Sequence, residues 1–98
     1  MTRRVIFRPQ AETESLEARD WYEARHAGLG HEFAKDVDRA IGMISDSPGV
    51  FARVHGDVRR MMLKRFPYAI YFRAVRDEIL ILAVMHGRRH PRRWKSRH

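Results

Sequence analysis

The sequence feature that most constrains the fold is an uninterrupted run of seven apolar residues, Ile79–Met85, near the end of the chain. A run of this length, bounded by a turn signal, predicts a β-strand over 78–85 that is buried on both faces. We therefore expect this strand at the centre of a sheet. The residues that follow it are strongly basic, and arginines are almost never buried without a partner. The strand should thus deliver a basic segment to the surface.

Length and composition limit the class of protein. Ninety-eight residues form a single domain, 1–98, close to the lower end of what one hydrophobic core supports. The absence of cysteine excludes disulfides and thiolate metal sites. No stretch approaches the roughly 20 apolar residues of a membrane helix, and the charged N-terminus lacks the apolar core of a signal peptide. We expect a cytoplasmic protein without a membrane partner.

The charge is unevenly distributed along the chain. Residues 1–49 contain seven Lys/Arg and nine Asp/Glu, a net charge of −2, whereas residues 50–98 contain thirteen and three, a net charge of +10. A field of one sign in one half of a chain favours an acidic partner, either nucleic acid or an acidic protein segment. The alternative is a solvated basic surface that only maintains solubility.

Two helices are predicted in the first half of the chain. Residues 10–28 are rich in Glu, Ala and Arg, and residues 31–46 follow after the break at Gly28 and Gly30. So short a break predicts an antiparallel hairpin. The first helix is apolar on two sides, because Leu16 lies away from its main stripe; Leu16 is then either a contact for a partner or an ordinary exposed leucine. The stripe of the second helix predicts a core face: Phe33, Val37, Ala40, Ile41 and Ile44.

The remaining segments predict strands. A short strand over 4–8 precedes the helices, and strands over 58–66, 68–73 and 78–85 follow as an antiparallel meander. Residues 50–57 are a loop or a short strand. The predicted fold class is α+β in the order β-α-α-β-β-β, with an N-terminal helical hairpin packed on a curved, mainly antiparallel sheet.

Several short motifs occur in a fixed order along the chain. They are Gly28-x-Gly30-x-x-Phe33, Phe66-Pro67-Tyr68-x-Ile70-x-Phe72-Arg73 and His86-x-Arg88-Arg89-x-Pro91-x-x-Trp94. Read together, these motifs resemble the ParE/RelE superfamily of toxins from bacterial type II toxin–antitoxin systems, and the ParE branch more than the RelE branch. The similarity covers nearly the whole chain.

This resemblance implies two different activities for the two branches. ParE-like toxins inhibit DNA gyrase by binding it and cut nothing themselves, whereas RelE-like toxins cleave messenger RNA in the ribosomal A site. Members of both branches are neutralised by a cognate antitoxin that wraps the toxin. The resemblance therefore implies a hetero-oligomer with an antitoxin, contact with operator DNA only through that antitoxin, and no cofactor.

A metal-independent ribonuclease is the alternative function. Cleavage needs a general base, cations near the phosphate and an acid for the leaving oxygen. Arg60, Arg73 and Arg88 are the candidate cations, and His86 is the candidate acid or base. The match to the RelE branch is incomplete, since Met62, Ala69 and Trp94 occupy positions where the resemblance implies a lysine, an arginine and a tyrosine. These substitutions favour the non-enzymatic function.

The sequence predicts two binding surfaces and no metal site. The cluster His86, His90 and His98 lacks a carboxylate that would complete a set of metal ligands. An antitoxin segment with acidic and apolar residues is expected against the helical hairpin and the sheet, and its predicted contacts are Leu16, Trp21 and Arg73. The residues predicted to bind the target combine basic and aromatic side chains: Arg59, Arg60, His86, Arg88, Arg89, Arg92, Arg93 and Trp94.

Structural roles are the alternative for several of these residues. Helical spacing places Trp21 in the core together with Tyr22. The pair Pro91 and Trp94 can fold the C-terminal segment back onto the sheet. A surface ion pair of Arg59 or its neighbour with a nearby aspartate contributes little stability.

Overall fold

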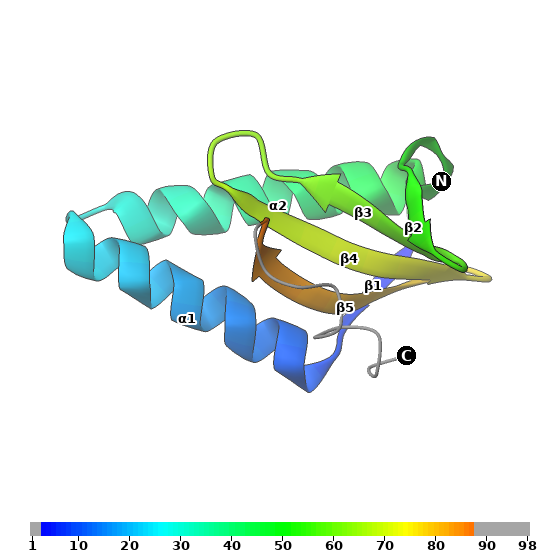
Figure 1. The fold of residues 1–98 in the computed structure, drawn as a ribbon, viewed down its shortest axis with the longest axis horizontal. Coiled ribbons are helices and arrows are strands. Elements are labelled where there is room, and N and C mark those ends of the chain that lie inside the picture. The colour runs from blue at the N-terminus through cyan, green and yellow to red at the C-terminus, as the bar shows by residue number, and fades with distance from the viewer. Residues whose placement is uncertain (1–2, 88–98) are drawn as a thin grey trace.

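The computed structural model describes residues 3–87 of the chain (Figure 1). Strand β1 (Arg4–Phe7) is followed by helices α1 (Pro9–Arg25) and α2 (Leu29–Asp46). A single 3-10 turn, η1 (Pro48–Val50), then leads to four strands: β2 (Arg53–His55), β3 (Val58–Met62), β4 (Tyr68–Val75) and β5 (Glu78–His86). The two helices form an antiparallel hairpin beside the sheet, which confirms the predicted α+β class.

The five strands form one mixed sheet in the order β1-β5-β4-β3-β2. Strand β1 is parallel to β5, and every other pair is antiparallel. The segment 50–57 contains the short strand β2, so four strands follow the helices where the predicted order has three. The prediction that β5 is the central strand is wrong by one position, because β4 occupies the centre. Strand β5 nevertheless has a neighbour on each side and is buried on both faces, as its apolar run requires.

The break between the helices lies two residues earlier than predicted, at 26–28. Gly28 adopts a left-handed conformation (φ 90°), and α2 begins at the next residue, so Gly30 lies inside the helix. A Cβ at Gly30 would lie 2.7 Å from the carbonyl oxygen of Arg19, so the close approach of the two helices requires glycine there. The carboxylate of Glu23 accepts hydrogen bonds from the N–H groups of Gly28 and Gly30 at 2.9 Å each and caps the new helix. These bonds lower the pKa of Glu23.

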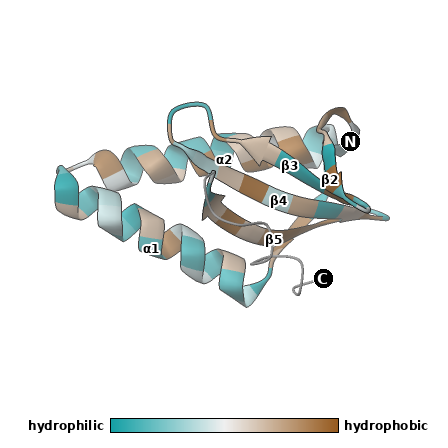
Figure 2. Cartoon of the chain, in the orientation of Figure 1, coloured by the Kyte–Doolittle hydropathy of each residue, from teal (hydrophilic) through white to brown (hydrophobic). Residues whose placement is uncertain are grey.

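One face of the sheet, here called the helix face, carries the hairpin and most of the core. At its centre the Tyr22 ring stacks on Phe33 at 5.4 Å and meets Phe66 edge-on at 4.8 Å. Figure 2 shows β5 as a largely hydrophobic strand of the sheet. The buried residues of the helix-face core are Ala11, Ala18, Phe33, Val37, Ala40, Ile44, Met61, Leu63, Phe66, Ile70, Phe72, Ile79, Ile81 and Val84.

The opposite side of the sheet, here called the second face, has a smaller apolar cluster. A register shift at Tyr71/Phe72 places one extra residue in β5, so that Leu82 and Ala83 both belong to this cluster although they are consecutive. All members of the cluster come from β3, β4 and β5: Val58, Ala69, Tyr71, Leu82, Ala83 and Met85.

The connection between β3 and β4 is fixed by a buried carboxylate. Asp36 of α2 is only 4% exposed. Its Oδ2 accepts the backbone N–H of Arg65 at 2.9 Å, and its Oδ1 accepts the Nη2 of Arg39 at 2.8 Å. The predicted strand over 58–66 therefore ends at Met62, because the residues after it turn toward the helix.

Candidate functional site

Two of the basic candidates, Arg60 and Arg73, lie on the second face. Arg60 is the register partner of Tyr71, which belongs to the buried cluster of that face. Arg73 follows Tyr71 by two residues in the same strand and points to the same side. Its Nε donates to both carboxylate oxygens of Asp57 at 3.2 Å, and its side chain is 25% exposed. The guanidinium of Arg73 is thus already paired within the chain.

His86 lies on the helix face, not with these arginines. It is the register partner of Tyr68, and the two ring centroids are 5.5 Å apart. Arg73 pairs with Leu80, five residues along β4 from Tyr68, which corresponds to about 16 Å along the strand. Arg88 lies outside the described residues. The described nuclease candidates therefore do not converge on one site.

Arg59 is held against a neighbouring loop. Its Nη1 donates to the carbonyl oxygen of Phe51 at 2.6 Å and to that of Gly49 at 3.4 Å. The carboxylate of Asp57 pairs with Arg73, so the ion pair that we predicted for Arg59 or its neighbour belongs to a different arginine. The role of Arg59 in this structure is to connect β3 to the turn η1.

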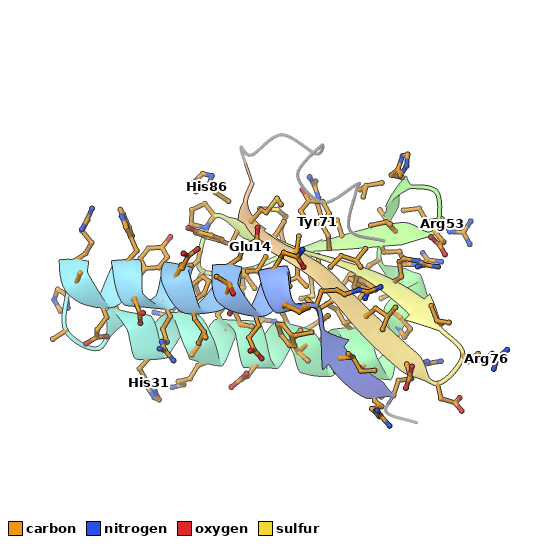
Figure 3. All side chains as sticks on the ribbon, turned by 90° about the horizontal axis from the view of Figure 1, so that it is seen from below. Glu14, His31, Arg53, Tyr71, Arg76 and His86 are labelled. Carbon is orange, nitrogen blue, oxygen red and sulfur yellow. The ribbon has the colours of Figure 1, made fainter. Side chains whose placement is uncertain are left out.

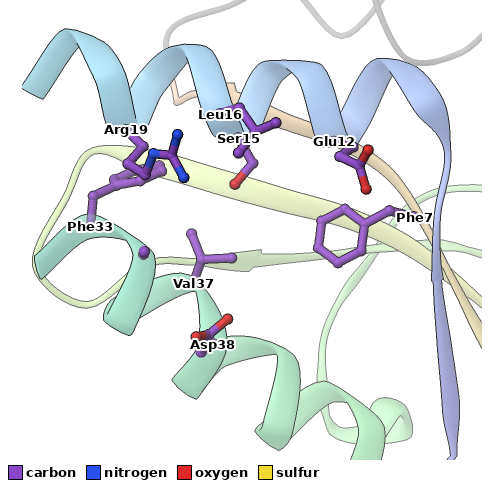
Figure 4. A pocket seen from close by; sticks show the side chains of 9 residues that line it. Phe7, Glu12, Ser15, Leu16, Arg19, Phe33, Val37 and Asp38 are labelled. Carbon is purple, nitrogen blue, oxygen red and sulfur yellow. The ribbon is translucent and has the colours of Figure 1, made fainter. Parts of the chain in front are cut away.

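A groove lies between the two helices, and Phe7 at the end of β1 also lines it (Figure 4). We call it the interhelical groove; its volume is about 200 Å³. Phe33 and Val37 are buried residues that line it, whereas Leu16 is 44% exposed. The charged side chains of Glu12, Arg19 and Asp38 complete its lining. An apolar floor with a charged rim suits one aliphatic side chain from an amphipathic segment.

A larger pocket lies between α1 and the end of β5. We call it the α1–β5 pocket; its volume is about 590 Å³, and its residues are Glu14, Glu17, Ala18, Trp21, Tyr22, Pro67, Tyr68, Val84, Met85 and His86.

Glu14 and Tyr22 are two of the polar residues that line the α1–β5 pocket. The Oε1 of Glu14 accepts the backbone N–H of Val84 at 3.0 Å, which connects the helix to the strand. Figure 3 shows Glu14 on the side of α1 that faces the end of β5, where His86 lies, whereas Arg53 and Arg76 point outward at the far end of the sheet. Burial, and then the nearby Tyr68, raise the pKa of Tyr22 above its ordinary value. Tyr22 is therefore a neutral wall of the pocket at physiological pH.

The prediction that Trp21 belongs to the core is wrong. Its side chain is 51% exposed and lies beneath the guanidinium of Arg25, 4.0 Å from the ring centroid. Tyr22 alone continues the buried stripe, because it lies four residues after Ala18.

The predicted antitoxin contacts are not brought together. Leu16 lines the interhelical groove, Trp21 lines the α1–β5 pocket and Arg73 lies on the second face. Sequence reasoning also missed Glu14 and Glu17. Their spacing with Trp21, at i, i+3 and i+7 of one helix, was the available signal for a shared face.

Several predicted site residues lie outside the described part of the chain, so their roles stay predictions: Arg88, Arg89, Arg92, Arg93 and Trp94. Within residues 3–87, no group of three potential metal ligands comes together. No helix in this range is both long and apolar enough to cross a membrane.

Comparison with known proteins identifies a family and a relative that match nearly the whole chain. The model of a family described as "ParE toxin of type II toxin-antitoxin system, parDE" matches residues 5–91. Toxin ParE2 of Mycobacterium tuberculosis, from strains CDC 1551 / Oshkosh and ATCC 25618 / H37Rv, is 30% identical over 92 residues. The match covers 93% of this chain and 88% of that toxin.

Two solved structures share the fold. A chain from the chromosomal ParDE toxin–antitoxin system of P. aeruginosa superposes with a TM-score of 0.73 at 19% identity, covering 87% of this chain and 96% of that one. A chain from the toxin–antitoxin complex RelBE2 of Mycobacterium tuberculosis gives a TM-score of 0.59 at 18% identity, covering 88% and 99%. At these identities the likeness establishes the fold alone.

Proposed function

The chain belongs to the ParE toxin family of type II toxin–antitoxin systems, and from this premise we propose that it inhibits DNA gyrase by binding it. Family membership also implies a cognate antitoxin. The proposed target acts on chromosomal DNA, so the proposal places the toxin in the cytoplasm.

The observation that carries the non-enzymatic proposal is the separation of the nuclease candidates. Arg60 and Arg73 lie on the second face, His86 lies on the helix face against Tyr68, and Asp57 already pairs with Arg73. RNA cleavage requires an acid or base and a phosphate-binding cation around one phosphate, within hydrogen-bond reach. This arrangement favours binding over cleavage.

The surface proposed for gyrase consists of Arg60 and the basic C-terminal segment. Arg60 is exposed, and no ion pair involves it among the described residues. Residues 88–98 add six Lys/Arg and no acidic residue. Such a surface suits an acidic patch on a protein, because guanidinium groups bind carboxylates in a bidentate manner. Arg59 contributes less to this surface, because carbonyl groups of its own chain already occupy its Nη1.

The surface proposed for the antitoxin is the interhelical groove. Buried Phe33 and half-exposed Leu16 provide an apolar seat. Arg19 pairs with Asp20 at 3.1 Å but stays 45% exposed, so it adds a cation for an acidic residue of the antitoxin. An amphipathic segment with apolar side chains at helical spacing is the partner that such a groove accepts. Contact with operator DNA is assigned to the antitoxin.

A supercoiling assay with purified gyrase, relaxed plasmid and the full chain tests the proposal. We expect the toxin to inhibit supercoiling, equimolar antitoxin to restore it, and Arg60→Ala to weaken the inhibition. Lys35→Ala, which removes the same charge from the exposed side of α2, is the matched control and should inhibit like the wild type. Normal supercoiling with excess toxin would contradict the proposal. Cuts at the ribosomal A site, seen by primer extension on translated messages, would establish the ribonuclease alternative.

A further inference from the structure

The α1–β5 pocket combines an aromatic wall with carboxylates from α1, and it opens beside strands from the basic half of the chain. Trp21, Tyr22 and Tyr68 contribute rings to its lining, and Glu14 and Glu17 contribute carboxylates from successive turns of α1. Residues 50–98 contain only three acidic residues and carry a net charge of +10. The pocket thus suits a guest that is flat, cationic and able to stack, which describes an arginine side chain.

A guanidinium already stacks on the Trp21 ring: that of Arg25 lies 4.0 Å from the ring centroid. This contact shows that the ring can bind an arginine side chain. The carboxylates lie on the adjacent part of the same helix face, since Glu17 precedes Trp21 by four residues and Glu14 by seven. The pocket therefore has room and charge for further arginines beside the one that it already borders.

The chain continues past this pocket into a segment whose sequence is rich in such side chains. His86 lines the pocket, and the sequence continues from Gly87 into a segment without acidic residues. Glu14 contacts the backbone of Val84, two residues before His86, which corresponds to about 7 Å along the strand. One residue spans at most about 3.6 Å, so the first arginines of the segment can reach this carboxylate. Its cationic residues are Arg88, Arg89, Arg92, Arg93, Lys95 and Arg97.

We propose that residues 88–98 dock into the α1–β5 pocket of their own chain, with arginine side chains against the carboxylates of Glu14 and Glu17. The tether makes the local concentration of the segment about millimolar, so weak ion pairs suffice for substantial occupancy. The same arginines form part of the surface proposed for gyrase, so docking competes with target binding. That consequence alone depends on the proposed function.

The test is paramagnetic NMR on the full chain. The sequence has no cysteine, so Ser96→Cys provides a unique site for a nitroxide label. We expect the label to broaden the amide signals of α1 residues that line the pocket, Glu17, Ala18 and Trp21, far more than that of Ala34 in the interhelical groove. The signals should recover in 1 M salt, where the screening length falls to about 3 Å.

A charge-reversed pair of variants provides the control. Glu17→Lys should abolish most of the broadening, whereas Glu12→Lys, the same change on the groove side of α1, should leave it unchanged. Both residues are exposed, so we expect each variant to fold like the wild type. Unchanged amide signals of the sheet residues would verify this. Neither gyrase nor antitoxin is present, so the result is independent of the proposed function.

Three outcomes would overturn the proposal. Broadening concentrated on second-face residues such as Tyr71 and Ala83 would place the segment on the other side of the sheet. Equal broadening in both charge variants would show that Glu17 does not hold the segment. In the third outcome, the label leaves the amide signals of the pocket residues unchanged, and added antitoxin shifts them. That result would assign the pocket to the antitoxin.

Discussion

The buried carboxylate of Asp36 provides a quantitative test of how the fold positions its pockets. Asp36 connects α2 to the loop between β3 and β4, which contains Pro67 of the α1–β5 pocket. The substitution Asp36→Asn preserves the shape of the side chain but removes its charge and replaces one acceptor with a donor. Either the N–H of Arg65 or the guanidinium of Arg39 then faces an N–H group of the new amide.

The magnitude follows from the burial and the partners of this carboxylate. A buried donor that loses its acceptor costs about 1–3 kcal/mol, and the ion pair with the half-exposed Arg39 adds little. We expect Asp36→Asn to lower the free energy of unfolding by about 2 kcal/mol, measured by urea denaturation at pH 7 with circular dichroism. The control is Asp38→Asn on the exposed side of α2, which should change stability by less than about 0.5 kcal/mol. Equal effects of the two variants would show that the buried hydrogen bonds of Asp36 do not stabilise the fold.

The pH dependence of the same variant has a definite sign. Burial raises the pKa of Asp36, but the hydrogen bonds from Arg65 and Arg39 lower it more, so the folded-state pKa lies below the ordinary value of 3.8. Its contribution to stability is therefore complete well above pH 3.8 and is lost as the pH falls through the folded-state pKa. The difference in stability between wild type and Asp36→Asn should shrink in acid. A difference that stays constant down to pH 2 would contradict the assigned hydrogen bonds.

Two further predictions concern the helical hairpin. Ala34→Leu should fill the interhelical groove and weaken antitoxin binding about 10- to 100-fold by calorimetry, since it excludes an aliphatic side chain whose burial contributes about 1.5–3 kcal/mol; Lys35→Leu on the exposed side should bind normally, and equal affinities would remove the groove from the antitoxin interface. Gly30→Ala should lower the melting temperature because its Cβ would meet the carbonyl oxygen of Arg19 at 2.7 Å, whereas Gly42→Ala, with open space around it, should raise stability by up to about 1 kcal/mol; a Gly30→Ala protein as stable as the wild type would show that the helices can separate without cost.

The sequence predicted those parts of the fold that depend on local periodicity. The apolar run Ile79–Met85 identified a strand buried on both faces, and the stripe of α2 identified its core side. The position of β5 within the sheet could not be predicted from the sequence, because it depends on the parallel pairing of β5 with β1 across more than 70 residues. Helix boundaries were also misplaced, because the Glu23 cap that starts α2 at Leu29 is a tertiary contact between two helices.

The candidate site was less predictable for a related reason. Arg60, Arg73 and His86 looked like one cluster in the sequence, but strand alternation places His86 on the opposite face from the arginines. The pairing of Arg73 with Asp57 joins residues 16 apart and has no local signal. Conversely, the helical spacing of Glu14 and Trp21 indicates a shared face of α1, but the pocket also needs the end of β5, which lies far from α1 in the sequence.

Equilibrium binding between the full chain and purified gyrase, without DNA, nucleotide or ribosomes, tests the proposed function directly. We expect saturable binding that weakens as salt screens the basic surface and that excess antitoxin abolishes. The absence of saturable binding would contradict the proposal that the toxin inhibits gyrase by binding it.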